Sequence, residues 1–142
     1  MADRPTLRPE TVAVSAGRPP RIPDAPMNEP VTFASAFVAG GPTEYARYGN
    51  PSWTALEDAL GALEGGMCST FASGMAAVSA VLSLVPHGGA VVVPRHAYQG
   101  TLALLDTEAG TGRFEVRRVD IADADAVEAA LPDAAMVWLE SP

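Results

Sequence analysis

The sequence predicts an α/β domain with a mostly parallel β-sheet and flanking helices, preceded by an extended N-terminal arm. From residue 50 onward, short apolar segments alternate with segments of helical periodicity, and this alternation is typical of a parallel, doubly wound sheet. The arm differs, because seven of the thirteen prolines fall within residues 1–30, where we expect neither regular helix nor sheet. We therefore divide the chain into an arm, residues 1–49, and an incomplete α/β domain, residues 50–142.

The first predicted helix directly follows the arm. Asn50 is a suitable N-cap, and Pro51 is a favourable first helical residue. Apolar side chains recur at helical spacing until a glycine pair ends the pattern: Trp53, Leu56, Leu60, Leu63 and Gly65-Gly66. A strand is predicted over 67–72 and a second helix over 74–85. This helix is apolar on nearly every side, so we expect it to be buried against the sheet.

The remaining elements continue the alternation. They are a strand over 90–93 stopped by Pro94, a helix over 99–109, a strand over 114–119, a helix over 123–131 and a strand over 135–139. The chain ends at Glu140-Ser141-Pro142, directly after a strand of apolar character. Since the next crossover and the sheet edge would be missing, we expect the sequence to be the N-terminal part of a longer protein.

The composition excludes several classes of function. A net charge of −8 and a pI of about 4.5 argue against a nucleic-acid partner. All nine basic residues are arginines, and the absence of lysine removes a Walker phosphate loop and Schiff-base chemistry by this chain alone. The single cysteine, Cys68, suits a reducing compartment. No apolar run reaches the ~20 residues that span a bilayer, and no signal peptide is present, so we expect a cytoplasmic protein without membrane contact.

The first candidate site comprises Ser73, Gly74 and Met75 at the predicted start of the second helix. Free backbone N–H groups at a helix start, together with the helix dipole, suit a phosphate group. Gly74 would let a ligand approach the backbone, and Ser73 would cap the helix or donate its hydroxyl. Taken alone, a Ser-Gly pair before a helix is more often only a cap.

The second candidate pair is Tyr45 and Arg47. Residues two apart in an extended segment project to the same side, so a hydroxyl and a guanidinium would be placed to hold one phosphate. The alternative is an ordinary loop whose arginine makes a surface ion pair.

Tyr98 is the third candidate, because it follows the 90–93 strand at the carboxyl end, where open α/β sheets bind ligands. An aromatic ring there would lie flat on a planar cofactor. Core packing of Tyr98 is the alternative, and the neighbouring Arg95 and His96 would then be surface or capping residues. Glu140 also follows a strand, where it is either functional or a cap of the next turn.

Together these segments resemble one family in order and spacing. The matching motifs are Tyr45-x-Arg47-x-x-Asn50-Pro51-Ser52, Leu63-Glu64-Gly65-Gly66, Ala72-Ser73-Gly74-Met75-Ala76-Ala77, Tyr98-x-Gly100-Thr101 and Glu140-Ser141-Pro142. They resemble the Cys/Met-metabolism enzymes that depend on pyridoxal 5'-phosphate (PLP), which include cystathionine γ-synthase, cystathionine γ-lyase and methionine γ-lyase. Residues 11–17 also resemble the family's N-terminal arm.

The resemblance implies a partial fold-type-I large domain, similar to that of aspartate aminotransferase, and PLP as the cofactor. It implies that Ser73, Gly74 and Met75 bind the cofactor phosphate and that Tyr98 stacks on the pyridine ring and assists proton transfer. Tyr45 and Arg47 would reach the cofactor of a neighbouring subunit, contacted by the arm, within a homotetramer built as a dimer of dimers. The family's lysine, its aspartate partner of the ring nitrogen and its substrate-binding arginine would lie beyond Pro142.

The resulting expectation is a transsulfuration-type C–S lyase or transferase acting on a small sulfur-containing amino acid, with this lysine-free chain inactive alone. The alternative is a short non-catalytic remnant that interacts with a full-length relative. A dinucleotide-binding domain is poorly supported because no Gly-x-Gly-x-x-Gly occurs, and a serine hydrolase because no Gly-x-Ser-x-Gly occurs. No Cys-x-x-Cys or His-Glu-x-x-His indicates a metal site.

Overall fold

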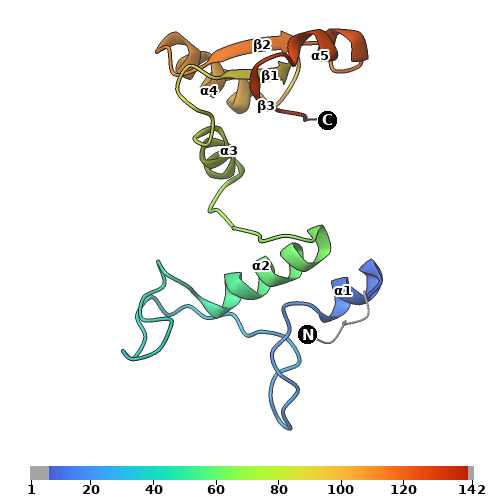
Figure 1. The fold of residues 1–142 in the computed structure, drawn as a ribbon. Helices are drawn as coiled ribbons and strands as arrows, with labels where there is room; N and C mark the ends of the chain where they lie inside the picture. The colour runs from blue at the N-terminus through green and yellow to red at the C-terminus, as the bar shows by residue number, and fades with distance from the viewer. Residues whose placement is uncertain (1–6, 141–142) are drawn as a thin grey trace. The chain divides into compact units, whose positions relative to one another are not determined.

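A computed structural model describes residues 7–140, so Ser141 and Pro142 of the last motif lie outside the described residues. The chain divides into two compact units, Met1–Thr70 and Phe71–Pro142, whose elements are shown in Figure 1. The unit boundary at Thr70 lies twenty-one residues after the predicted end of the arm at residue 49. The helix predicted to begin after Asn50 therefore belongs to the same compact unit as the arm. The domain boundary between residues 49 and 50 stays a prediction.

The first unit begins with helix α1, Pro9–Ser15. The expectation that the proline-rich segment forms no regular helix is wrong for these seven residues. Pro9 stands at the first helical position, where its fixed φ is compatible with helix and no N–H is needed. After the helix, Gly17 adopts a φ of +68°, and a Cβ there would lie 2.1 Å from the carbonyl oxygen of Ala55. A glycine is therefore required where the arm passes the second helix.

Helix α2, Pro51–Glu64, confirms the first predicted helix and both of its caps. The Asn50 side chain accepts a hydrogen bond from the Ser52 N–H, and Gly65 ends the helix in the left-handed conformation. The Asn50 amide nitrogen also donates to the carbonyl of Thr32 at 3.0 Å. This buried side chain therefore joins the start of α2 to the arm.

The strand predicted over 67–72 is wrong, because these residues form no regular element. Met67 is fully exposed, and the Thr70 N–H donates to the Glu57 carboxylate at 2.7 Å rather than to a strand. A strand forms only where a neighbouring strand completes its ladder. No such neighbour is found among residues 7–140, so the apolar character of the run was misleading.

The second unit contains the predicted parallel sheet. Strands β1 (Ala90–Pro94), β2 (Glu115–Val119) and β3 (Ala134–Val137) are all parallel in the order β2-β1-β3. The central strand is buried along its whole length, as its run of three valines predicts. In the register, Val92 is paired with Arg117 on one side and with Val137 on the other.

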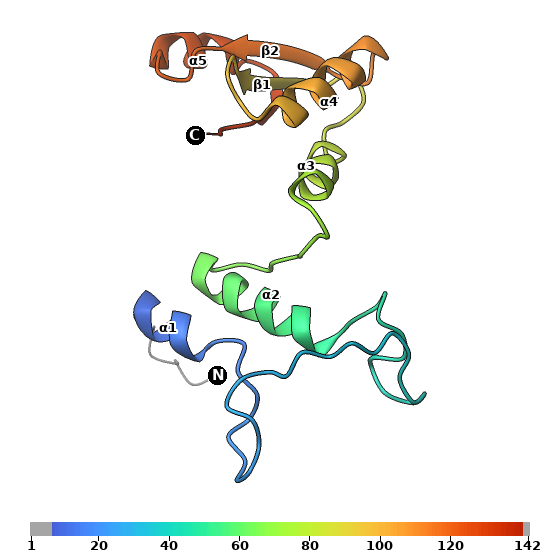
Figure 2. The same ribbon diagram turned by 180° about the vertical axis from the view of Figure 1, so that it is seen from behind.

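Three helices accompany this sheet: α3 (Gly74–Leu82), α4 (Gln99–Gly110) and α5 (Ala124–Ala130). Figures 1 and 2, seen from opposite directions, show α4 and α5 on opposite faces of the sheet. Each of the connections β1-α4-β2 and β2-α5-β3 joins two parallel strands through one helix. This is the doubly wound arrangement that the alternation of strands and helices predicts. The fold class expected from the sequence is confirmed in this partial form.

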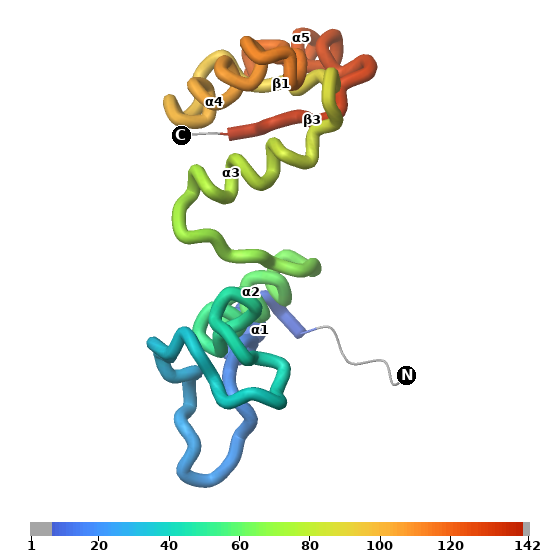
Figure 3. Tube along the Cα trace, turned by 90° about the vertical axis from the view of Figure 1, so that its left-hand side faces the viewer, coloured from blue at the N-terminus to red at the C-terminus, as the bar shows by residue number. Residues whose placement is uncertain are grey.

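The core of the second unit lies between β1, α4 and the end of α3. Its buried side chains are Leu82, Val85, Val91, Val93, Leu105 and Phe114. Only Leu82 of helix α3 is buried, so the expectation that this helix is buried against the sheet is wrong for the described residues. Figure 3 traces the chain from α3 through a turn into β1. Leu82 at the end of α3 and Val85 in the following turn belong to the core.

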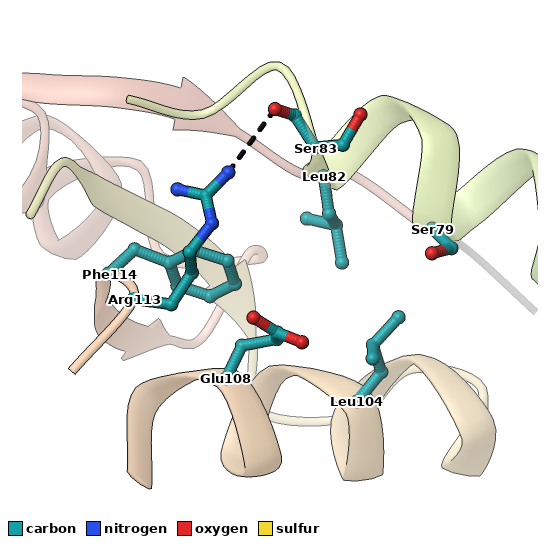
Figure 4. A pocket seen from close by; sticks show the side chains of 7 residues that line it. All are labelled: Ser79, Leu82, Ser83, Leu104, Glu108, Arg113 and Phe114. Carbon is teal, nitrogen blue, oxygen red and sulfur yellow. Dashed lines mark hydrogen bonds between the residues drawn. The ribbon is translucent and has the colours of Figure 1, made fainter. Parts of the chain in front are cut away.

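Arg113 fixes the end of α3 to the start of β2. Its guanidinium donates to the carbonyl of Val85 at 2.8 Å and to that of Ser83 at 3.2 Å, as Figure 4 shows for Ser83. A cation that binds the last carbonyls of a helix also complements the helix dipole. The small cavity beside it, about 210 Å³, lies between α3 and α4 and is distinct from the site described below. None of the helices in the described part of the chain is long and apolar enough to cross a bilayer.

Candidate functional site

A larger cavity of about 460 Å³ opens at the carboxyl end of the sheet in the second unit. Its walls come from three segments that are far apart in the sequence but adjacent in the fold. They are Ser73, Gly74, Met75 and Val78 of α3, Tyr98 and Thr101 at the start of α4, and Trp138 and Glu140 after β3. The structure thus brings together the Ser73-Gly74-Met75 segment, Tyr98 and Glu140, which the sequence named separately.

The start of α3 forms the polar side of this cavity. The Ser73 hydroxyl accepts from the Ala76 N–H at 3.2 Å and caps the helix, as one reading of the sequence predicted. Within the described residues, the N–H groups of Gly74 and Met75 have no hydrogen-bond acceptor. A Cβ at Gly74 would meet no atom within 4 Å. Two backbone donors at the positive end of a helix are therefore open to an anion.

Tyr98 presents its ring to the same cavity. The residue is 60% exposed, so the alternative of core packing is wrong. A Cβ at Gly100 would lie 2.7 Å from Cε1 of Tyr98 and 2.9 Å from Sδ of Met75. The ring therefore rests against the Gly100 backbone beside the start of α3, with much of its surface free to contact a planar group.

Glu140, whose role the sequence left open, contacts the start of α4. Its carboxylate accepts the Tyr98 N–H at 2.9 Å through Oε1 and the Trp138 indole N–H at 3.1 Å through Oε2. Glu140 therefore caps the start of α4, whereas the expected cap of the turn after Glu140 lies outside the described residues. A second cavity of about 340 Å³, lined by His96, Ala97, Tyr98 and Glu140, adjoins this pair.

Sequence reasoning missed three residues of the cavity, the apolar Val78 and the polar Thr101 and Trp138. Thr101 is 1% exposed, and its hydroxyl has no hydrogen-bond partner among the described residues. A buried polar atom without a partner is an exception in folded proteins, and here it lies in the wall of the cavity. The signals were available, because Thr101 lies one helical turn after Tyr98, and Trp138 lies on the same side of an extended segment as Glu140.

Tyr45 and Arg47 lie in the first unit and do not line this cavity. The extended segment expected here is wrong, because residues 46–48 form a turn in which the Tyr48 N–H donates to the Tyr45 carbonyl at 2.8 Å. The two side chains still lie together, with the Arg47 guanidinium carbon 5.2 Å from the centre of the Tyr45 ring. Tyr48 packs edge-on against Tyr45, at 6.5 Å between ring centres. Their role toward a neighbouring subunit stays a prediction.

Comparison with known proteins identifies the family. The family model of Cys/Met metabolism PLP-dependent enzymes matches residues 10–142. A cystathionine gamma-synthase of Mycobacterium tuberculosis is 40% identical over 143 residues, covering 94% of this chain. The chain spans 37% of the length of that relative.

Solved structures agree in fold. A cystathionine gamma-lyase (CalE6) from Micromonospora echinospora superposes with a TM-score of 0.83 at 33% identity, covering 96% of this chain and 38% of that protein. The cystathionine gamma-synthase of Xanthomonas oryzae pv. oryzae in complex with cystathionine gives a TM-score of 0.80 at 31% identity, covering 92% and 36%. Five helices and a small parallel sheet represent part of the PLP fold type I.

The family's cofactor is PLP, and the cavity fits this group. Open N–H groups of Gly74 and Met75 match a phosphate, and the exposed Tyr98 ring matches a pyridine face. Residue chemistry, fold and sequence similarity agree. The chain belongs to the Cys/Met metabolism family of PLP-dependent enzymes.

Proposed function

We propose that this chain is part of a PLP-dependent enzyme that eliminates or replaces a sulfur-linked group at the β or γ carbon of an amino acid. The names of the relatives support this reaction class, and the Xanthomonas enzyme was solved with cystathionine. Because the chain spans 37% of the M. tuberculosis relative, the activity is assigned to the full-length gene product. The 142-residue chain, which contains no lysine, is proposed to be inactive alone.

The cofactor phosphate is proposed to accept the backbone N–H groups of Gly74 and Met75, with Ser73 holding the helix start in place. Bound PLP withdraws electrons from the α carbon of an amino-acid substrate. The Tyr98 ring would support the face of the cofactor, and its hydroxyl would assist proton transfer near the leaving group. The single observation that carries this proposal is that two unpaired helix-start donors and an exposed aromatic ring line one cavity.

Tyr45 and Arg47 are proposed to complete the site of a neighbouring subunit within a dimer of dimers. Both are exposed, and the cation–π contact between them joins the hydroxyl and the guanidinium in one group. Such a group pairs a hydrogen-bond donor with a planar cation, which suits a phosphate. The proposal predicts that Arg47→Gln weakens PLP binding only in the oligomer. PLP titrations at protein concentrations above and below the one at which the oligomer dissociates into subunits measure this difference.

Gly74→Ala in the full-length product tests the phosphate site. The added methyl meets no protein atom within 4 Å, so folding should persist while the approach of a ligand to the backbone is obstructed. We expect PLP affinity, measured by absorbance titration, to fall by roughly tenfold, which corresponds to about 1.4 kcal/mol. Gly110→Ala is the matched control, because a Cβ there also meets no atom within 4 Å and Gly110 lies at the far end of α4.

Pyridoxal, which lacks the phosphate, should bind the wild type more weakly than PLP does. Equal binding of the two compounds, or an unchanged affinity of Gly74→Ala for PLP, would contradict the phosphate site. The alternative of a non-catalytic interaction partner is decided by reading the coding DNA past Pro142, because it requires a stop codon there. A frame that continues to an aspartate and a lysine supports the enzyme.

A further inference from the structure

The start of α4 has no cap within its own sequence. Tyr98 is the N-cap residue, and its side chain makes no capping hydrogen bond. The N–H groups at a helix start have no acceptor inside the helix and require one from elsewhere. Here the Tyr98 N–H donates to a carboxylate that lies 42 positions later in the sequence, at Glu140. The negative charge also complements the positive end of the helix.

Glu140 is itself held in place. Its second carboxylate oxygen accepts the Trp138 indole N–H at 3.1 Å, and the Trp138 backbone N–H donates to the carbonyl of Val92 in the central strand at 2.8 Å. Both oxygens of the carboxylate therefore accept a hydrogen bond, and the segment that carries them is bonded to β1. Through these contacts the start of α4 is linked to the strand that precedes it.

The position of Tyr98 depends on this link. Its ring is not enclosed, because the residue is 60% exposed, and one side rests on Gly100 and Met75. Burial therefore contributes little to fixing the ring. The Tyr98 backbone is held by its N–H bond to Glu140 and by its carbonyl, which accepts the Leu102 N–H at 3.1 Å in the first turn of α4. Tyr98 and Glu140 together line both cavities, of about 460 Å³ and about 340 Å³. A shift of this pair would change the shape of both.

We propose that Glu140 is a positioning residue for Tyr98: its carboxylate, held by Trp138, fixes the start of α4 so that the Tyr98 ring faces the cofactor cavity. The inference rests on the proposed function for the identity of the ligand. Among the described residues, both hydrogen bonds of the Glu140 carboxylate come from protein N–H groups, and one of these is the N–H of Tyr98, so the contact through which Glu140 acts is with Tyr98. A carboxylate suits this place because it accepts at both oxygens, whereas an amide accepts at one.

Glu140→Gln in the full-length product tests the proposal. A glutamine offers one oxygen and one NH₂ group, so either the Tyr98 N–H or the Trp138 N–H would face a donor. We expect PLP affinity to fall by roughly tenfold, as is common when the partner of a ligand-binding group is removed. We also expect an altered circular-dichroism band of the bound cofactor, and faster amide exchange at Tyr98. Glu108→Gln is the control, because it makes the same substitution at a residue of α4 that does not line the cofactor cavity.

The double variant Glu140→Gln/Trp138→Phe separates positioning from a general loss of stability. Phenylalanine removes the competing donor, so the glutamine oxygen is free to accept the Tyr98 N–H. The cofactor dichroism and the Tyr98 exchange rate should then return to those of Trp138→Phe alone, and no such recovery would be expected from two independent defects.

This inference alone would be overturned if the wild type binds PLP and Glu140→Gln matches it in PLP affinity, in cofactor dichroism and in amide exchange at Tyr98. If Glu140→Gln does not fold, Trp138→Phe decides the question through amide exchange at Tyr98, which must become faster when Glu140 loses the hydrogen bond that holds it. Unchanged exchange would overturn the inference. Failure of the wild type to bind PLP would overturn the proposed function together with the inference.

Discussion

Strand β1 in the second unit is buried along its whole length, whereas helix α2 in the first unit leaves its apolar side partly uncovered. The apolar side chains of α2 are between 37% and 51% exposed: Trp53, Leu56, Leu60 and Leu63. Among the described residues, every buried large apolar side chain lies between Leu82 and Val119. The second unit therefore rests on a desolvated core, while the first depends on hydrogen bonds such as those of Asn50.

The largest difference between the two units should appear when a leucine is truncated in each. Leu105→Ala removes a fully buried side chain from the core of the second unit and should lower the free energy of unfolding by about 2–5 kcal/mol. Leu60→Ala removes a side chain that is 40% exposed and should cost less than about 1 kcal/mol. Urea unfolding of the 142-residue chain, with hydrogen exchange to separate β1 from α2, measures both.

An equal cost for the two leucine variants would break this comparison. It would mean that the apolar side of α2 is covered in solution, and the cost would then depend on protein concentration if a second copy covers it. Sedimentation of the same samples distinguishes these cases.

A smaller effect is expected from Asn50, the buried polar side chain of the first unit. Asn50→Ala removes the cap of α2 and the donor to Thr32, and should destabilise α2 by about 1–3 kcal/mol. Asn50→Ser retains a capping oxygen but not the amide donor, so it should fall between the alanine variant and wild type. Hydrogen exchange in α2 measures the loss, and exchange in β1 should not change.

Unchanged exchange in α2 after Asn50→Ala would show that the first unit is stabilised by contacts other than this residue. An equal loss in α2 and β1 would show that the two units unfold together. Either result would require the comparison between a core-stabilised unit and a hydrogen-bonded unit to be revised.

Those elements whose signals are local were predicted from the sequence. Helix α2 has a periodic apolar side, an asparagine cap and a glycine end, and β1 is a continuous valine run. The predicted strand over 67–72 failed because a strand needs a partner, which the local sequence does not specify. Helix α1 was missed because the prolines of the arm outweighed a seven-residue segment in which Pro9 occupies the one position that tolerates it.

The candidate site shows the same division. Ser73, Gly74 and Met75 were found because a Ser-Gly pair directly precedes an apolar helical segment in the sequence, although the strand expected before the pair does not form. The contact between Glu140 and Tyr98 was not found, because it depends on β3 lying beside β1 and so bringing residues 42 positions apart together. The place of Thr101 one helical turn after Tyr98 could be read from the sequence, whereas the missing partner of its hydroxyl could not, because that depends on the side chains packed around it.

The smallest expected effect concerns a surface ion pair on β2. The Glu115 carboxylate accepts from the Arg117 guanidinium at 2.9 Å, and this hydrogen bond, with the attraction of the charge, lowers the pKa of Glu115 below its ordinary value of 4.5. A lowered pKa stabilises the folded state at pH values above 4.5, and the contribution is lost as the pH falls through the lowered pKa. Because both side chains are reached by water, the contribution should be slight.

Glu115→Gln should therefore lower the melting temperature slightly at neutral pH. The control is Glu128→Gln, because Glu128 is an exposed carboxyl without a side-chain hydrogen bond among the described residues. The difference should vanish at a pH well below 4.5, where the wild-type carboxyl is also neutral. A difference that persists in acid would mean that the hydrogen bond rather than the charge contributes. A difference as large as that of Leu105→Ala would mean that the second unit depends on its surface as much as on its core.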